Sequence, residues 1–372
     1  MGRQKYINIL IKPASSICNM QCRYCFYNDV AMHRACKGKG IIDSATTSAV
    51  IDKALALSET AIITFAFQGG EPTLAGLSFF EAFVEEVNKK RKGQEIRYSI
   101  QTNGLAIDRA WVNFFRQNAF LVGLSIDGPA EFNDSFRIDL SGLGTYKRIL
   151  TVLRLLQKCD VRVNVLTVLT EKLARHPQSV WKWICKESID YVQFIPCLPG
   201  LDESKNVWAL TPETFAQFYK RIFDLWENNL FTGTYRSIWL FENMLQLASG
   251  LFPSQCGMLG KCSPQIIVES NGDIYPCDFY ALDVYRIGNI NEISLEEYAK
   301  SPILAQFLSE PRRSCTKCTD CPYEQVCHRN CKRLSIAYYN DTYCGLRSLY
   351  EYSYARINRI AQVFPVATKD TF

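Results

Sequence analysis

Histidine is scarce in this chain, with only three in 372 residues. Histidine is the commonest metal ligand among side chains and the usual proton carrier near neutral pH, so its scarcity argues against histidine-based metal sites and histidine-driven acid–base chemistry. The sequence also lacks any stretch that approaches the ~20 apolar residues of a membrane span. These absences leave cysteine and the carboxylates as the residues for metal and proton chemistry.

Cysteine, in contrast, is abundant and unevenly placed. Of the 16 cysteines, four lie between residues 18 and 36 and nine lie between residues 256 and 344. A secreted scaffold stapled by disulfides is usually much shorter, whereas clustered Cys-x2-Cys spacings in a longer chain favour metal ligation. The apolar run at residues 7–11 is too short for a signal-peptide core. We therefore expect a protein of a reducing compartment, the cytoplasm.

The charge of the chain is mild. A formal net charge of +5 over 372 residues does not by itself indicate a nucleic-acid partner. Together with the missing apolar span, it leads us to expect neither a nucleic acid nor a membrane as partner. At this length, two domains are the natural expectation.

The first 235 residues alternate short apolar runs with longer amphipathic stretches. The predicted strands are residues 7–11, 61–67, 96–101, 121–126, 161–169 and 191–195. The predicted helices are residues 44–58, 77–90, 108–118, 145–159 and 178–187, and one more that begins at Pro212 and ends at Gly233. The strands show little polar alternation, as expected when both faces are covered. Six strand–helix repeats predict a parallel sheet with right-handed crossovers, in the form of an incomplete barrel.

A different organisation begins near residues 235–250. A further helix is predicted at residues 238–248, and the second group of cysteines follows it. Within that group, residues 265–275 predict a hairpin around Asn271-Gly272, the preferred two-residue turn because both central positions need positive φ. We place the two domains at residues 1–235 and 236–372.

Three cysteines near the start of the chain have the spacing Cys18-x3-Cys22-x2-Cys25. Three thiolates can hold three irons of a four-iron cluster and leave the fourth iron open to a small molecule, because a fully ligated cluster takes four cysteines. The alternatives are a disulfide or a zinc knuckle. Zinc would need a fourth nearby ligand, and the next candidates are His33 and Cys36.

Polar, glycine-containing segments follow the next three predicted strands. They are Gln68-Gly69-Gly70-Glu71-Pro72, Gln101-Thr102-Asn103-Gly104 and Ser125-Ile126-Asp127-Gly128-Pro129. In barrels of this kind, catalytic groups project from the carboxyl ends of the strands. Each segment alone is a weak signal, since ordinary turns also contain Gly-Gly, Asn-Gly and Gly-Pro.

The three-cysteine motif and the Gly-Gly-Glu-Pro loop together resemble the radical S-adenosylmethionine (SAM) enzymes, which share a partial (β/α)6 barrel. The resemblance implies an α/β fold in which SAM binds the open iron of a cluster held by Cys18, Cys22 and Cys25. It also implies the following SAM-binding residues: Tyr24 in the cysteine loop, Gly70 at the amino group, Ser125 and Arg137 at the ribose and carboxylate, and Leu198 at the adenine, with Arg148 as a second candidate for the carboxylate.

The second cysteine group contains the spacing Cys318-x2-Cys321-x5-Cys327-x3-Cys331, which resembles the SPASM extension of radical SAM enzymes. The resemblance implies two auxiliary clusters, one on Cys256, Cys262, Cys277 and Cys331 and the other on Cys318, Cys321, Cys327 and Cys344. Cys315 departs from the pattern because it creates an alternative Cys-x2-Cys pair. A pair of four-cysteine zinc sites is the alternative. We expect the unassigned Cys36, Cys159, Cys185, Cys197 and Cys315 to be buried free thiols.

Over nearly its full length the chain resembles the anaerobic sulfatase-maturating enzymes, most closely in Cys-x3-Cys-x-Tyr-Cys-Phe-Tyr, in Gln193-Phe194-Ile195-Pro196-Cys197-Leu198 and in Tyr275-Pro276-Cys277-Asp278-Phe279-Tyr280. The resemblance implies oxidation of one Cys or Ser of a nascent, unfolded sulfatase, in a Cys/Ser-x-Pro/Ala-x-Arg motif, to Cα-formylglycine. It implies SAM and three 4Fe-4S clusters as cofactors, and a flavodoxin- or ferredoxin-type electron donor.

Within that resemblance, Asp278 is the leading catalytic residue. A 5′-deoxyadenosyl radical would take a hydrogen atom from the substrate Cβ, Asp278 would take the proton of the sulfur or oxygen, and the auxiliary clusters would accept the second electron. Before the resemblance is considered, the alternative for Asp278 is a solvated turn residue.

Other functions stay open. The nearest is a SPASM peptide maturase that forms thioether or carbon crosslinks, which often carries a leader-binding domain; here the first predicted strand begins by residue 7, which makes this option less favoured. A zinc-bearing nucleic-acid module and a non-catalytic electron carrier are further alternatives, but neither needs a barrel with a Gly-Gly-Glu-Pro loop.

Overall fold

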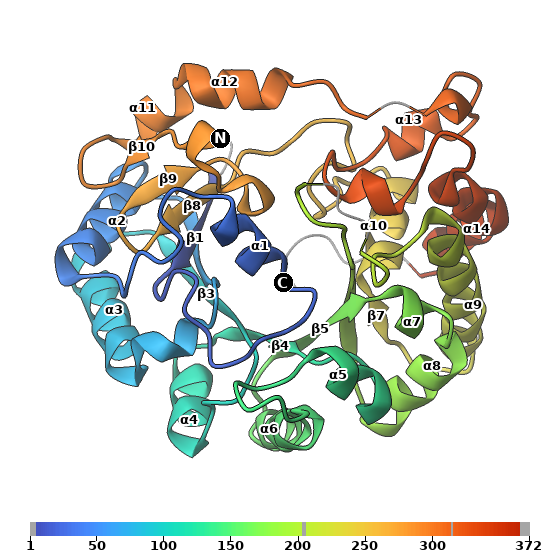
Figure 1. Ribbon diagram of the computed structural model, residues 1–372, viewed down its shortest axis with the longest axis horizontal. Helices are drawn as coiled ribbons and strands as arrows, with labels where there is room; N and C mark the ends of the chain where they lie inside the picture. The colour runs from blue at the N-terminus through green and yellow to red at the C-terminus, as the bar shows by residue number, and fades with distance from the viewer. Residues whose placement is uncertain (1–4, 203–205, 314, 365–372) are drawn as a thin grey trace. The chain divides into compact units, whose positions relative to one another are not determined.

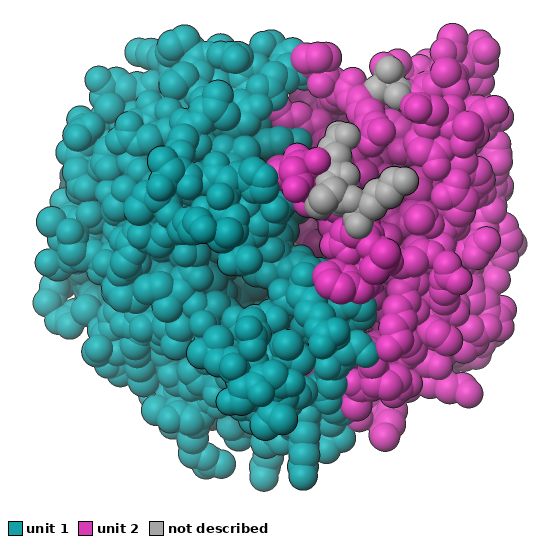
Figure 2. Space-filling model, in the orientation of Figure 1, with its two compact units in different colours: residues 1–126, 134–164, 264–310 teal, residues 127–133, 165–263, 311–372 magenta. Residues whose placement is uncertain are grey.

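The structure is a computed structural model that describes residues 5–202, 206–313 and 315–364 (Figure 1). Its contacts group the chain into two compact units (Figure 2). Unit 1 comprises residues 1–126, 134–164 and 264–310, and unit 2 comprises residues 127–133, 165–263 and 311–372. The predicted domains divide the chain at one point, residue 235, whereas each compact unit is built from three separate segments. The two divisions describe different things, so the predicted domain boundary stays a prediction.

The strands of unit 1 follow the order β10-β9-β8-β1-β2-β3-β4. Four of them are parallel neighbours: β1 (Tyr6–Lys12), β2 (Ile62–Phe67), β3 (Glu95–Thr102) and β4 (Leu121–Ser125). On the other side of β1, β8 (Ile266–Glu269) pairs parallel to it and continues into the antiparallel β9 (Asp273–Tyr275) and β10 (Gly288–Asn289). A hairpin from the second cysteine group therefore lies in the same sheet as the first strand.

Helices and an aromatic core complete unit 1. The helices are α1 (Phe26–Met32), α2 (Ser44–Ala56), α3 (Leu77–Lys90), α4 (Arg109–Gln117), α6 (Tyr146–Lys158), α11 (Leu295–Ala299) and α12 (Pro302–Ser309), while α5 (Ala130–Phe136) has residues in both units. Asp43 and Asp108 cap α2 and α4 by accepting hydrogen bonds from backbone N–H groups, which fixes where these helices begin. Phe67 of β2 packs edge-on against Phe80 and Phe83 of α3, with ring centroids 4.9 and 5.0 Å away.

Unit 2 contains most of β5 (Val163–Leu169), followed by β6 (Tyr191–Pro196) and β7 (Ser237–Ile238), all parallel. Its helices are α7 (Glu171–Ala174), α8 (Pro177–Lys186), α9 (Pro212–Phe231), α10 (Trp239–Ala248), α13 (Glu324–Cys327) and α14 (Gly345–Val363). The aromatic face of α9 packs on its neighbours: the ring centroid of Phe223 lies 5.2 Å from that of Phe241 in α10. Arg356 of α14 pairs with Asp224 of α9.

The six predicted strands and the seven predicted helices are confirmed, with ends that agree to within two residues. Seven further helices in the segments that the structure describes were not predicted: α1, α5, α7, α11, α12, α13 and α14. Among the described residues, no helix combines the length and apolar character that a membrane crossing requires.

The hairpin of residues 265–275 is confirmed, but the predicted turn is wrong. Ile267 pairs with Tyr275 and Val268 with Ile274, so the loop between β8 and β9 contains three residues, 270–272. Of these, Gly272 alone has positive φ, at 86°, and its N–H donates to Glu269 O (2.8 Å). This is the three-residue hairpin, in which a right-handed turn precedes a glycine in the left-handed region.

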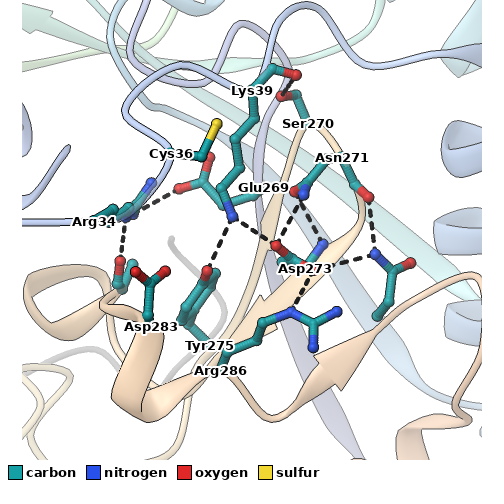
Figure 3. A network of polar contacts seen from close by, with 12 residues as sticks. Arg34, Cys36, Lys39, Glu269, Ser270, Asn271, Asp273, Tyr275, Asp283 and Arg286 are labelled. Atoms are coloured by element: carbon teal, nitrogen blue, oxygen red, sulfur yellow. Dashed lines mark hydrogen bonds and ion pairs between the residues drawn. The ribbon is translucent and has the colours of Figure 1, made fainter.

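A buried polar network holds this hairpin to the segment that follows α1 (Figure 3). Lys39 Nζ donates to Asp273 Oδ2 (2.6 Å) and to Tyr275 OH (3.1 Å). Arg286 Nε donates to the other oxygen of Asp273 (2.6 Å). Burial acts to raise the pKa of Asp273, but hydrogen bonds from Lys39, Asn271 and Arg286 outweigh it and lower the pKa to about 2. The hairpin is therefore anchored through the ionised form of Asp273.

Replacing Asp273 by Asn should weaken this anchor in a pH-dependent way. Because the folded pKa lies below the ordinary value of 3.8, the ionised form stabilises the fold fully above about pH 4, and this contribution is lost as the pH falls toward 2. We expect Asp273→Asn to lower the free energy of unfolding at pH 7 by about 1–2 kcal/mol, with a smaller difference from the parent below about pH 4.

Urea unfolding of cluster-free protein across this pH range measures the difference. The control is Asp160→Asn, because Asp160 is exposed and its positive φ of 53° suits Asn. A difference between Asp273→Asn and the parent that stays constant from pH 7 to pH 3 would contradict the ionic anchor.

Candidate active site

The three predicted cluster ligands lie on the loop between β1 and α1. Cys18 Sγ accepts a hydrogen bond from the Met20 N–H (3.4 Å). Cys25 Sγ accepts one from the Asn28 N–H (3.4 Å) and so caps α1. Hydrogen bonds to the sulfurs are one of the means by which proteins tune a cluster held by thiolates.

The sulfurs of this loop affect one another. Burial and, to a smaller extent, negative charge on Glu71, Cys22 and Cys25 together raise the pKa of Cys18 to about 12, against the hydrogen bond from Met20. At neutral pH the Cys18 thiol is therefore protonated, and a metal that binds it as a thiolate must displace the proton. The structure thus gathers the three cysteines into one group, as their spacing predicts.

The Gly-Gly-Glu-Pro loop after β2 holds the cysteine loop by its backbone. The Gly70 N–H donates to Ser15 O (2.7 Å), and the Glu71 N–H donates to Ile17 O (2.8 Å). A Cβ at Gly70 would lie 2.2 Å from Ile17 O, so only glycine permits this approach. The Gly-Gly-Glu-Pro loop and the cysteine loop are therefore held together by backbone hydrogen bonds next to Cys18.

Glu71 is a buried carboxylate that joins the ends of β2 and β3. It accepts hydrogen bonds from Thr73 Oγ1 (2.6 Å), Thr102 Oγ1 (2.8 Å) and the Asn103 N–H (2.7 Å). Burial raises the pKa of Glu71, and these hydrogen bonds oppose the increase. The Asn103 side chain in turn donates to Cys18 Sγ at 3.7 Å. The sequence singled out both motifs, but this shared carboxylate is visible only in the structure.

On its other side, the cysteine loop contacts the last residue of α5, Phe136, and the residue after it, Arg137. The Arg23 N–H donates to Phe136 O (3.1 Å). Arg137 is buried, and its Nη1 donates to Tyr24 OH (3.1 Å). The structure therefore brings together two of the predicted SAM-binding residues, Tyr24 and Arg137.

Three predicted SAM-binding residues remain, and each comes from a different part of the chain: Ser125, Arg148 and Leu198. Ser125 is buried at the carboxyl end of β4. The resemblance implies that SAM binds at this end of the strands. Arg148 forms an ion pair with Asp139 and is half exposed, so it already has a carboxylate partner. Leu198 follows β6 in unit 2 and is half-buried.

Asp278 begins a short 3-10 turn directly after Cys277. Lys12, the last residue of β1, donates from Nζ to Asp278 Oδ1, and Gln68 Nε2, directly after β2, donates to Oδ2 (2.9 Å). The Lys12 side chain is fully buried and that of Asp278 is 14% exposed. Asp278 is thus held at the carboxyl ends of β1 and β2, and the alternative of a solvated turn residue is wrong.

Close to the pair of Lys12 and Asp278, the buried Glu269 at the end of β8 contacts α1 and residues before and after it. It accepts hydrogen bonds from Tyr27 OH and Ser15 Oγ (3.2 Å), and it forms an ion pair with Arg34 (2.9 Å; Figure 3 shows Arg34 and Glu269). Lys12 Nζ lies 3.5 Å from the centroid of the Tyr27 ring, which adds a cation–π contact. Sequence reasoning missed Lys12, Tyr27, Arg34 and Glu269, because their partners are far apart in the chain.

The second predicted auxiliary set comes together within unit 2. Cys318, Cys321, Cys327 and Cys344 all line one cavity, whose walls also include Arg329 and Arg347. Burial raises the pKa of Cys327 to about 12 and that of Cys344 to about 11, and the charges of neighbouring cysteines add to both shifts. The cavity thus combines four mutually close thiols with three cationic side chains, the third being Lys317, and with the carboxylate of Glu324.

The first predicted auxiliary set is only partly within one unit. In unit 2, burial raises the pKa of Cys256, and the charges of Cys331 and Cys262 raise it further, so these three are neighbours. Cys277 belongs to unit 1, where it follows β9.

Two further findings concern the cysteines of the described segments. No group of three or more His, Cys, Asp or Glu there lies close enough to hold a single metal ion; in a four-iron cluster, each thiolate binds a different iron. Among the unassigned cysteines, Cys197 and Cys315 are buried as predicted, Cys159 and Cys185 are half-buried, and Cys36 is exposed, so its predicted burial is wrong.

Replacing Gly70 by Ala should disturb the cysteine loop. The added Cβ would overlap the Ile17 backbone, so the loop must move. We expect Gly70→Ala to lower the free energy of unfolding by about 1–3 kcal/mol and to lower the iron content after anaerobic reconstitution.

The control for that prediction is Gly38→Ala. A Cβ at Gly38 would meet only Ser16 Oγ, at 3.8 Å, so this variant should stay within about 0.5 kcal/mol of the parent. Equal stability and iron content in both variants would show that the approach of Gly70 to Ile17 is unimportant.

Comparisons with known proteins agree with this geometry. A family model described as the Radical SAM superfamily matches residues 13–175, and one described as the SPASM iron-sulfur cluster-binding domain matches residues 260–322. A cysteine-type anaerobic sulfatase-maturating enzyme of Clostridium novyi is 37% identical over 88% of each chain. One of Clostridium perfringens is 36% identical over 95% of this chain and 98% of its own.

A solved structure is similar to this chain in both fold and sequence. It is named native anSMEcpe with bound AdoMet and Kp18Cys peptide, and it matches with a TM-score of 0.89 and 36% identity over 96% of this chain and 99% of that chain. The predicted fold class, a partial (β/α)6 barrel followed by a cysteine-rich SPASM domain, is confirmed. The chain therefore belongs to the anaerobic sulfatase-maturating enzymes of the radical SAM superfamily.

Proposed function

We propose that this enzyme uses SAM and iron–sulfur clusters to oxidise one Cys or Ser of a sulfatase polypeptide to Cα-formylglycine. The observation that carries the proposal lies within unit 1: the ends of β1 and β2 hold both the loop of Cys18, Cys22 and Cys25 and the carboxylate of Asp278. A metal-binding loop and a proton acceptor at one sheet edge suit a reaction that removes a hydrogen atom and a proton from the same residue.

Cys18, Cys22 and Cys25 would hold the cluster that binds SAM. Their grouping on one loop, with N–H donors to two of the sulfurs, fits such a cluster. When bound, the cluster and SAM supply the radical chemistry that removes a hydrogen atom from the substrate Cβ.

The chain's own residues would orient SAM. The buried guanidinium of Arg137 lies against Tyr24 and suits a carboxylate, because arginine binds carboxylates with parallel N–H groups. Gly70 keeps the neighbouring backbone close to the cysteine loop, which suits contact with the amino group. Ser125 would bind the ribose and Leu198 would contact the adenine.

Asp278 would accept the proton of the substrate thiol or hydroxyl. Each carboxylate oxygen has two lone pairs, so the hydrogen bonds from Lys12 and Gln68 leave each oxygen able to accept another. The same two donors fix the direction in which the carboxylate points. A proton acceptor must lie within hydrogen-bond reach of the proton that it takes, and this fixed position suits a substrate side chain that binds at the carboxyl ends of β1 and β2.

The other cysteines would hold two auxiliary clusters, which makes three 4Fe-4S clusters in all. Cys318, Cys321, Cys327 and Cys344 would hold one, supported by their common cavity. Cys256, Cys262, Cys277 and Cys331 would hold the other, supported by the proximity of Cys256, Cys262 and Cys331. A flavodoxin- or ferredoxin-type protein would supply the electron needed to cleave SAM. The auxiliary clusters would accept the electron that the substrate radical gives up.

The substrate would be an unfolded or nascent sulfatase with a Cys/Ser-x-Pro/Ala-x-Arg motif, met in the reducing cytoplasm that 16 cysteines favour. The cysteine-type relatives at 36–37% identity support a cysteine substrate.

The proposed activity is tested with reconstituted protein, SAM, a reductant and a peptide that contains Cys-x-Pro-x-Arg, all without oxygen. Mass spectrometry should find the –CH2SH group replaced by –CHO, together with 5′-deoxyadenosine. A peptide with Ala in place of Cys is the control. A product that has lost only two hydrogens would indicate a crosslinking maturase, and SAM cleavage without any change in the peptide would contradict sulfatase maturation.

Asp278→Asn tests the proton acceptor. The amide can still contact Lys12 and Gln68 but accepts no proton, so we expect turnover to fall by about 10²–10⁴ while iron content stays at the parent level. The control is Asp283→Asn, because Asp283 is an exposed carboxylate five residues further along that bonds to the Ala35 N–H. Parent-like turnover in Asp278→Asn removes Asp278 from the mechanism.

A further inference from the structure

A fifth cysteine lies beside the cavity of the four predicted auxiliary ligands in unit 2. Cys315 precedes Cys318 by three residues, so the chain contains two overlapping Cys-x2-Cys pairs. The Cys318 N–H donates to Cys315 O (2.9 Å), which places both residues in one tight turn. Cys315 is only 4% exposed. The family pattern gives this buried thiol no role.

The sulfur of Cys315 lies against the loop that leads to Cys344. Its S–H donates to Asn340 O (3.1 Å), and the next residue, Thr316, donates from Oγ1 to Asp341 O (3.0 Å). Tyr339 and Cys344 form an antiparallel bridge that closes this loop. The turn with Cys315 and the loop with Cys344 are therefore joined by two side-chain contacts.

The charge interactions among the cysteines indicate that Cys315 lies nearer to Cys318 and Cys344 than to Cys327. Burial raises the pKa values of Cys318 and Cys344, and in both cases Cys315 contributes more than any other cysteine charge. For Cys327, the contributing cysteine charges are instead those of Cys344, Cys318 and Cys321. Cys315 thus lies near Cys344 and Cys318.

We propose that Cys315 is a reserve ligand of this auxiliary cluster and can take the place of Cys344. In the exchange, the Cys344 sulfur leaves its iron and gains a proton, while the Cys315 thiol loses a proton and bonds that iron, so no electron is transferred. The reserve thiol lets the site keep its cluster when Cys344 is lost. This inference rests on the auxiliary cluster proposed above and is independent of the oxidation of sulfatases.

Iron and sulfide content after anaerobic reconstitution test the reserve ligand, in the full chain and its variants. Cys344→Ala and Cys315→Ala should each keep the parent content, and the reduced Cys344→Ala protein should give a changed electron paramagnetic resonance signal because one ligand differs. The double variant leaves one iron of this cluster without a cysteine ligand, so it should hold the cluster less tightly, lose up to about one third of the iron, and give a signal that differs from that of Cys344→Ala. Loss of that third in Cys344→Ala alone would overturn the proposal.

The matched control is Cys327→Ala, which should lose up to about one third of the iron whether or not Cys315 is present. Retention of iron by Cys327→Ala, or loss of iron by Cys315→Ala alone, would also overturn the proposal. If Cys344→Ala does not fold, Cys344→Ser is compared with and without Cys315→Ala in the same way. A parent protein without auxiliary iron would overturn the auxiliary cluster itself, and this result is seen before any variant is made.

Discussion

The buried carboxylate of Glu71 is the contact on which the arrangement of the candidate active site depends. It accepts hydrogen bonds from Thr102 and Asn103 and so joins the end of β3 to the loop after β2. The backbone of that loop, from Gly70 to Glu71, is bonded to the carbonyl groups of the cysteine loop. A carboxylate without water stays satisfied only through such donors, so its burial requires the geometry that places the three cysteines together.

A second constraint brings distant parts of the sequence to the same place. The hairpin of β8 and β9 pairs with β1, although more than 250 residues separate them. Glu269 and Asp273, near its turn, bind Arg34 and Lys39 from the segment after α1. This attachment carries Asp278 to Lys12 and Gln68 at the sheet edge. The cysteine loop and Asp278 are thus positioned by one sheet within unit 1.

Much of the fold follows from local sequence patterns, whereas the site depends on pairings that no local pattern contains. Apolar runs and amphipathic periods predicted β1 to β6 and their helices. The group of Cys318, Cys321, Cys327 and Cys344 was implied by the family resemblance, because spacing alone also allowed Cys315. The parallel pairing of β8 with β1 could not be predicted, because β8 is short and its partner is far away in the chain. The Asn271-Gly272 turn was predicted as two residues, but the pairing of β8 with β9 selects a three-residue loop. Buried charges such as Lys12 and Glu269 are, in a sequence, no different from surface charges.

The central claim is that the loop of Cys18, Cys22 and Cys25 holds a cluster with one position left for SAM. Electron paramagnetic resonance of the reduced, anaerobically reconstituted protein tests it most directly, with a variant that has Ala at all three positions as the reference for the auxiliary clusters. We expect the signal that is missing from this variant to change in the parent protein when SAM is added. A signal that does not respond to SAM, or an unchanged iron content in the triple variant, would contradict it.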